Sequence, residues 1–172
     1  DDDFIFPSAM NHCVEFLSAN NDYTAASGRS YLFAVDDMDT SATISSIEVY
    51  PQLEFVSNSP ELRFKAHMKN WTTSAYSVQR TTNLKEIIDF HKQFVDDIRF
   101  MEIHWYATNI IRGKVAKLNE AYMFRQISLQ KEWRCDVFSD WTKTPGFLEN
   151  KKILISVLAK EIAKKNNQSL EY

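Results

Sequence analysis

Apolar and polar residues alternate most regularly between residues 62 and 80. A period of two gives a strand one apolar and one polar face, and here the polar face is basic. After a polar break at residues 70–74, Tyr76 and Val78 resume the alternation, so the two runs predict an antiparallel hairpin. The first run places Leu62, Phe64, Ala66 and Met68 on its apolar face and Arg63, Lys65, His67 and Lys69 on its basic face.

The residues after this hairpin change to helical spacing. Asn83 stands three residues before Glu86, which predicts a side-chain cap with a reciprocal carboxylate at the start of a helix. We expect Ile87 and Phe94 to be buried between this helix and the hairpin, and His91 to be a hydrogen-bonded core residue. The apolar face at helical spacing is Leu84, Ile87, Ile88, His91, Phe94, Val95 and Ile98.

The remaining chain predicts two strands and three more helices. Pro51 breaks a β-rich stretch at 44–56, which suits an edge strand or a bent strand because proline cannot donate to the ladder. The pattern of residues 99–117 fits a strand, a continued helix or an ordered loop equally well. The other expected segments are a helix at 8–17, a loop at 20–28, a strand at 31–35, a linker at 36–43, and helices at 118–141 and 148–165.

Together these elements predict an α+β fold, a small three-stranded antiparallel sheet packed on a helical subdomain. The chain has 172 residues, 44% of them apolar, so it can bury one substantial core. The start on aspartates, without methionine, suggests a piece cut from a longer protein. We expect an acidic N-terminal extension at residues 1–43, one domain at 44–165 and a tail at 166–172.

Charge is divided unevenly along the chain. Residues 1–58 carry ten Asp and Glu residues and only Arg29, so the remainder has a formal charge of +6 although the whole chain has −3. A basic body is compatible with an anionic membrane surface and equally with an ordinary solvated surface. Cys13 and Cys135 lack metal-ligand spacing, so we expect two reduced, packed thiols in a cytoplasmic protein.

The order of the elements resembles that of the Phox homology (PX) domain. The resemblance covers roughly residues 44–160, and one segment that carries it, Phe64–Phe94, reads FKAHMKNWTTSAYSVQRTTNLKEIIDFHKQF. It is similar to the PX strand that ends in V-x-R-R-Y/F and leads into a helix. Residues 133–158, with the Thr144-Pro145 pair, look like the PX ending. The closer resemblance is to the atypical PX domains of the retromer-linked sorting nexins, which implies a module of endosomal protein transport.

Two departures from the family pattern bear on lipid binding. In the PX family the arginine beside the position of Arg80 commonly holds the 3-phosphate, but Thr81 and Thr82 follow here. A neutral hydroxyl cannot replace a charge-assisted, bidentate contact to phosphate. The family's second basic position falls near Gln130. The resemblance therefore implies a degenerate 3-phosphoinositide pocket, and the residues left to hold a lipid headgroup are Arg80, Lys114, Lys117 and Lys131.

Three functions follow as hypotheses. The first is recognition of a protein or peptide partner, by addition of a peptide strand to an exposed sheet edge. The second is membrane targeting, in which a rearranged basic site binds a phosphoinositide and the protein sits peripherally on anionic endosomal lipid. The third is a structural scaffold domain without a lipid role.

Catalysis and nucleic-acid binding are not expected. The four histidines form no recognised catalytic or metal-binding signature, and the chain has no glycine-rich phosphate loop. We therefore expect no enzyme activity, no metal and no cofactor. Trp71 and Tyr76 lie near the basic strand face, but packing at the hairpin explains them more simply than stacking on nucleic acid bases.

Overall fold

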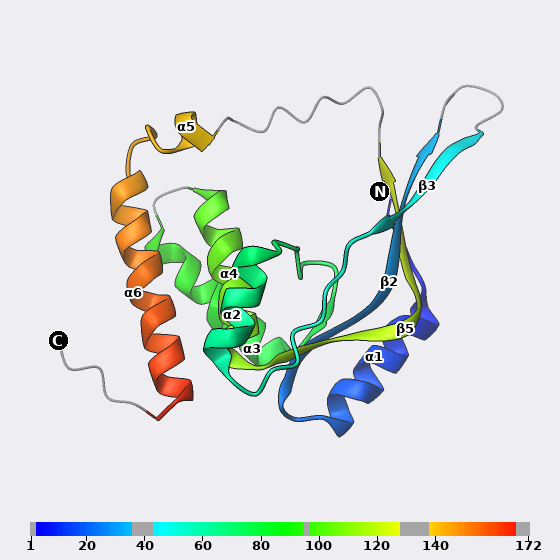
Figure 1. The fold of residues 1–172 in the computed structure, drawn as a ribbon, viewed down its shortest axis with the longest axis horizontal. Coiled ribbons are helices and arrows are strands. Elements are labelled where there is room, and N and C mark those ends of the chain that lie inside the picture. Colours follow the sequence, from blue (N-terminus) through cyan, green and yellow to red (C-terminus); the bar gives the residue numbers. More distant parts are fainter. Residues whose placement is uncertain (1–2, 36–42, 95–96, 128–137, 168–172) are drawn as a thin grey trace.

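The computed structural model describes residues 3–35, 43–94, 97–127 and 138–167. It confirms an α+β architecture (Figure 1). The strands are β1 (Asp3–Ile5), β2 (Tyr23–Val35), β3 (Ile44–Tyr50), β4 (Val78–Gln79) and β5 (Lys114–Ile127). The helices are α1 (Pro7–Ala19), α2 (Pro60–Lys69), α3 (Thr81–Phe90), the 3₁₀ turn η1 (His91–Gln93), α4 (Ile98–Arg112), α5 (Phe138–Trp141) and α6 (Phe147–Lys165).

The sheet has five strands rather than the predicted three, and it is not purely antiparallel. Its order is β1-β5-β2-β3, and β4 pairs with the start of β2. β2 and β5 run parallel at its centre, whereas the other pairs are antiparallel. A parallel pair requires a long crossover, which here contains β3, β4 and three of the helices.

Helix α1 covers one face of the sheet. Its buried residues Ala9, Cys13 and Leu17 pack against a cluster that includes Tyr122 and Met123 of β5. This confirms the predicted helix at 8–17. Burial raises the pKa of the Cys13 thiol to about 11, so this cysteine is a packed, protonated thiol. Cys135 lies outside the described residues.

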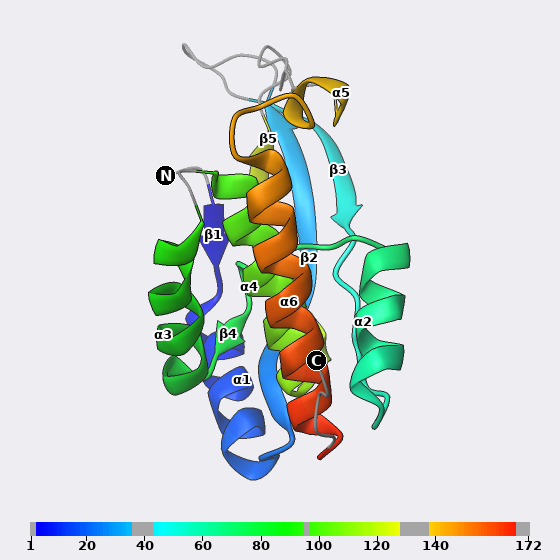
Figure 2. The ribbon, with the colours of Figure 1, turned by 90° about the vertical axis from the view of Figure 1, so that its left-hand side faces the viewer.

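A second core lies between the helices. Figure 2 shows α6 lying over α4, with α2 and α3 on either side. Ile87 and Phe94 are buried, as predicted. Phe94, however, packs against Phe100 of α4 and Leu158 of α6 instead of a hairpin. The predicted helix at 148–165 is confirmed as α6.

The predicted hairpin is wrong, because residues 62–68 belong to helix α2. The Ser59 side chain caps this helix by accepting the Leu62 N–H at 3.2 Å, and Pro60 occupies the first helical position, which proline favours. Leu62 is 59% exposed, although the prediction placed it on the apolar face. The residues that α2 does bury, at helical spacing, are Pro60, Arg63 and His67.

The helix after Arg80 also differs from the prediction. α3 begins at Thr81 without a side-chain cap, and Asn83 instead donates to the Asn109 side chain at 2.7 Å. The chain then passes through η1 into α4, which takes up most of the open stretch at 99–117. Tertiary contacts of Asn83 have replaced the local cap that its spacing from Glu86 predicted.

Strand β5 replaces the first part of the helix predicted at 118–141. Lys117, Asn119 and Ala121 are exposed, but the neighbouring residues Tyr122 and Met123 are both buried where the register with β2 shifts, so the period of two is interrupted. Of that predicted helix, residues 128–137 lie outside the described part and 138–141 form the short helix α5. The strand predicted at 31–35 is confirmed within β2, but β2 already begins at Tyr23, so the loop predicted at 20–28 is largely wrong.

The predicted extension at residues 1–43 is built into the sheet. Its described part supplies β1, α1 and β2, and β2 pairs with both β3 and β5. Ala25 and Ala26 of β2 are completely buried. The boundary expected near residue 43 therefore lies between two paired strands. Where the structure describes the chain, no helix has the length and apolar character needed to cross a bilayer.

Candidate functional site

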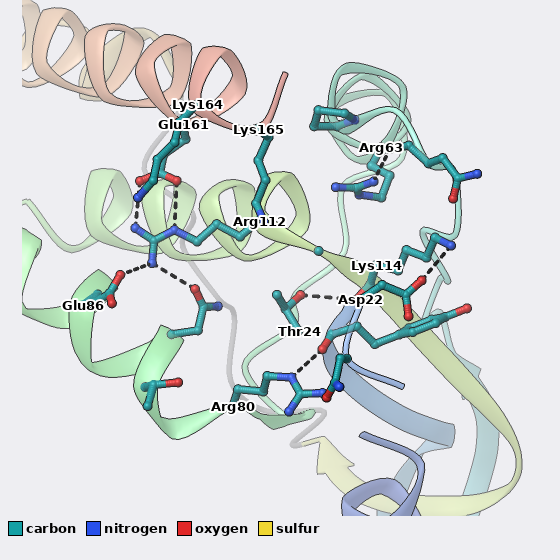
Figure 3. A pocket seen from close by; sticks show the side chains of 17 residues that line it. Asp22, Thr24, Arg63, Arg80, Glu86, Arg112, Lys114, Glu161, Lys164 and Lys165 are labelled. Carbon is teal, nitrogen blue, oxygen red and sulfur yellow. Dashed lines mark hydrogen bonds and ion pairs between the residues drawn. The ribbon is translucent and has the colours of Figure 1, made fainter. Parts of the chain in front are cut away.

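A pocket of about 480 Å³ opens where the starts of β2, α2 and α3 meet the α4–β5 junction and the end of α6 (Figure 3). This volume lies within the usual range for small-molecule sites. Six cationic and three acidic side chains line it, which gives a formal charge of +3. The cations are Arg63, Arg80, Arg112, Lys114, Lys164 and Lys165, and the acids are Asp22, Glu86 and Glu161.

Arg63 holds one wall of the pocket together. Its side chain is 5% exposed and donates to four main-chain carbonyls. Nε and Nη2 donate to the Ile110 and Ile111 oxygens, each at 2.7 Å, in the last turn of α4. Nη1 donates to the Ser57 and Asn58 oxygens at 2.6 and 3.1 Å. Burial lowers the pKa of Arg63, yet a guanidinium stays charged, so this cation satisfies carbonyls that the helix end leaves open.

Arg80 does the same for helix α1. Its Nε donates to the Tyr23 oxygen at 2.7 Å, and Nη2 donates to the Leu17 and Asn20 oxygens at 2.5 and 3.0 Å. Its main-chain N–H donates to the Thr24 oxygen at 3.1 Å. Nη1 has no hydrogen bond to any described residue, so it can still donate. Arg80 therefore fixes the α1–β2 connection and keeps two N–H groups for a ligand.

Arg112 is neutralised within the pocket. It forms a bidentate pair with Glu161, in which Nη2 and Nε lie 2.7 and 2.9 Å from the carboxylate oxygens, and Nη1 donates to Glu86 and Asn83, each at 2.9 Å. Burial acts to raise the pKa of Glu161, but the hydrogen bonds from Arg112 outweigh it and the pKa is lowered. Both groups are therefore charged, and they link α4 to α6.

Lys114 pairs with the third carboxylate. Its Nζ lies 2.9 Å from Asp22, and this hydrogen bond lowers the pKa of Asp22. All three acids of the pocket are thus paired with Arg112 or Lys114. The ammonium groups of Lys164 and Lys165, at the end of α6, make no hydrogen bond with a described residue, although the charge of Lys164 helps to lower the pKa of Glu161, and Figure 3 shows Lys165 reaching from α6 toward the pocket. These two ammonium groups are available to an incoming anion.

The start of α3 adds polar groups of the same sign. Thr82 and Asn83 lie in its first turn and line the pocket, and no side chain caps this end of the helix. The first N–H groups of a helix point outward and carry its partial positive charge. An anion at this position would therefore meet main-chain donors as well as lysine and arginine side chains.

Gly113 permits the close approach of β2 to the α4–β5 junction. A Cβ at this position would lie 2.6 Å from Thr24 Cγ2 and 2.9 Å from the Asp22 oxygen. We expect Gly113→Ala to lower the free energy of unfolding by about 1 to 3 kcal/mol, because the main chain of β2 must move. Urea denaturation measures this change. Ala121→Ser, a change at an exposed residue of the adjoining strand β5, serves as control, and equal unfolding midpoints for both variants would contradict the close approach.

The structure brings two of the four predicted lipid-binding residues into this pocket. Arg80 and Lys114 line it. Lys117 lies in a separate hollow with Arg29 and Tyr50, so it belongs to another surface. Lys131 lies outside the described residues. Of the predicted basic site, the structure therefore brings only Arg80 and Lys114 together, and their role in lipid binding stays a prediction.

The sequence analysis did not identify four of the six cations as site residues. Arg63 was assigned to an exposed strand face, and Arg112 fell in the stretch that stayed open. Lys164 and Lys165 lie at the end of the helix predicted at 148–165, where no site was expected. The Ser59-Pro60 pair is a helix-start signal, and it would have moved Arg63 from a strand face to a helix.

Comparisons with known proteins place the chain in no family. A scan against protein-family models gives no match, and a search of the curated proteins gives none either. The function must therefore be argued from the pocket and from the surface of the molecule.

Proposed function

We propose that this chain is a binding module whose basic pocket takes an anionic, phosphate-bearing ligand. One observation carries the proposal: the ammonium groups of Lys164 and Lys165 and the Nη1 of Arg80 have no hydrogen bond to a described residue, and they line one pocket beside the uncapped start of α3. The pocket's carboxylates already bind Arg112 and Lys114, and of the three groups only Lys164 acts on one of them, through its charge, which helps to lower the pKa of Glu161.

A phosphate group suits this arrangement better than a carboxylate does. It offers three oxygens and up to two negative charges, which can be shared between the first turn of α3, the Arg80 guanidinium and the lysines of α6. The ligand could be a soluble phosphate compound or the headgroup of a phosphoinositide. Both present the same chemistry to the pocket, so the experiment has to separate them.

Titration calorimetry at physiological salt tests the pocket with inositol hexakisphosphate, pyrophosphate and a nucleoside diphosphate as soluble probes. We expect binding to at least one probe, and about tenfold weaker binding to the double variant Lys164→Gln/Lys165→Gln. The matched control is Lys151→Gln/Lys152→Gln, which removes the same charge near the other end of α6. Equal weakening in both variants would indicate unspecific attraction and contradict the proposal.

Vesicles separate the two sources of phosphate. Sedimentation with phosphatidylcholine vesicles, with and without a phosphoinositide, shows whether the pocket accepts a headgroup in a membrane. Binding only to the soluble probes would indicate a soluble ligand. Arg80→Ala is unsuitable for this test, because it also removes three hydrogen bonds that hold α1 and β2.

A place in endosomal transport is a weaker part of the proposal. It rests on the PX resemblance, and the segment that carries this resemblance begins with residues 64–69, which belong to helix α2 instead of the expected strand. The PX-like three-stranded sheet therefore has no support in the strand order. Peripheral location on endosomal membranes and membership of the family stay predictions, and the phosphoinositide vesicles bear on both.

Recognition of a protein partner is the second candidate function. β3 forms an outer edge of the sheet, and its side chains are mostly exposed. A strand with unpaired main-chain groups can accept a strand from another chain. Addition of a strand from a partner therefore stays a prediction, and β3 is the edge at which it would occur.

Catalysis does not enter the proposal. Of the three aspartates at the start of the sequence, only Asp3 is described, and its carboxylate lies 3.7 Å from Arg125. That the chain is not an enzyme stays a prediction. A scaffold role without any ligand is the outcome if every probe fails to bind.

A further inference from the structure

The outer edge strand β3 combines two features that are unusual together. Among the described strands it pairs only with β2, so its other side presents unpaired N–H and C=O groups. In Figures 1 and 2 it lies away from the helices. Ile47 and Val49 share one face of the strand and are 57% and 72% exposed. Such an edge is a template for pairing with another strand.

The usual protection against edge pairing is weak here. Charged residues, prolines and bulges normally block an exposed edge. Glu48 is the one charged residue of β3, Pro51 follows only after the strand ends, and the register shift lies at its beginning, near Ile44. The middle of the strand therefore stays regular and open to a partner.

We propose that β3 pairs with β3 of a second copy of this chain, antiparallel and about a two-fold axis at Ile47. This inference rests on the second candidate function and specifies its partner. In this register Ile47 faces Ile47, Val49 faces Ser45, and Glu48 faces Ser46. No two like charges stand directly opposite each other, and the exposed apolar side chains meet across the axis.

The neighbouring registers are less favourable than the one at Ile47. The sequence of β3 is therefore suited to pairing with an identical strand, which a second copy of the chain supplies. An axis at Glu48 would place two carboxylates directly opposite each other, which destabilises a strand pair. An axis at Val49 would place Pro51 opposite Ile47, and proline cannot donate to the ladder. An axis at Ser46 would place Ile47 opposite Ser45, so the exposed isoleucines would not face each other. Of these four registers, the one at Ile47 alone pairs exposed apolar side chains without opposing charges or proline. The pairing joins two five-stranded sheets into one and forms an isologous dimer.

Analytical ultracentrifugation of the wild-type chain, at concentrations up to about 100 μM, tests the dimer, since one short strand pair gives a weak interface. We expect concentration-dependent dimers. Ile47→Lys should abolish them by placing two ammonium groups face to face, and so should Ile47→Glu. Mixing these two variants should restore a dimer, because opposite charges then meet on the axis.

Ile155→Lys on α6 is the matched control, because Ile155 is exposed to the same degree, 58%, far from β3 in the chain. It should dimerise like the wild type. Circular dichroism of each variant checks that it is folded. A wild-type chain that stays monomeric, or a dimer that Ile47→Lys leaves intact, would overturn the inference. A monomer that still binds phosphate probes would leave the pocket proposal standing, so the two failures are distinguishable.

Discussion

Replacing Arg63 with leucine is expected to lower the free energy of unfolding by about 4 kcal/mol or more. The guanidinium donates to four carbonyls, two of them at the end of α4, and it is almost completely buried. A hydrogen bond from a charged donor contributes about 1.5 to 3 kcal/mol. A buried carbonyl left without a donor also costs free energy, because water cannot replace the lost donor. Ser57 and Asn58 can regain water, which limits the loss.

Urea denaturation of Arg63→Leu measures this change, and two further variants are compared with it. Lys65→Leu alters an exposed residue of the same helix and should change stability by less than about 0.5 kcal/mol. Arg63→Lys keeps the charge but cannot reach four carbonyls at once, so its loss should fall between the two. A loss below about 1 kcal/mol for Arg63→Leu would show that the Arg63 contacts do not hold α2 to α4.

Acidification from pH 7 to pH 5 is expected to cost about 4 kcal/mol of stability through two buried histidines. Burial lowers the pKa of both His67 and His104 to about 4, from 6.5 for an exposed histidine. His67 is packed between the rings of Phe55 and Trp71, and neither of its ring nitrogens has a partner among the described residues.

The sign follows from these pKa values. Below pH 6.5 these two histidines bind protons in the unfolded chain but stay neutral in the folded chain. Their contribution to stability is therefore complete above that pH and falls as the pH drops toward 4. At pH 5 each histidine contributes about 2 kcal/mol to the loss, because one pKa unit corresponds to about 1.4 kcal/mol.

Urea denaturation at several pH values measures the profile. His67→Phe keeps the aromatic packing and should remove about half of the loss between pH 7 and pH 5. His12→Gln is the control: His12 is exposed beside Glu120, which raises its pKa, so removing it should not flatten the profile. Equal profiles for the wild type and His67→Phe would contradict a neutral, unpartnered His67.

The sequence analysis identified helices α1 and α6 because each shows an apolar stripe that local spacing reveals. It failed at α2, where the buried stripe includes Arg63 and His67, which a polarity pattern assigns to the surface. It also failed at β5, because the neighbouring residues Tyr122 and Met123 are both buried where the pairing register shifts, which interrupts the period of two. These elements depend on tertiary partners that no single stretch of sequence contains.

The basic pocket was predictable only in part for the same reason. The prediction named Arg80 because it matches an arginine of the family pattern, and Lys114 as part of a rearranged basic site around it. Lys164 and Lys165 are more than eighty residues from Arg80 in the sequence, and only the packing of α6 on α4 brings them to the same pocket. Local patterns predict which residues are basic, whereas topology decides which of them meet.

The most direct measurement of the pocket proposal is a set of amide chemical shifts, recorded by NMR while inositol hexakisphosphate or pyrophosphate is added at physiological salt. The account predicts saturable changes at the first turn of α3, at Thr82 and Asn83, and at the end of α6, at Lys164 and Lys165. The amides around Lys117, in the separate hollow, should stay unchanged. Shift changes centred on Lys117, or unsaturable changes spread over all surface lysines, would contradict a phosphate site in the basic pocket.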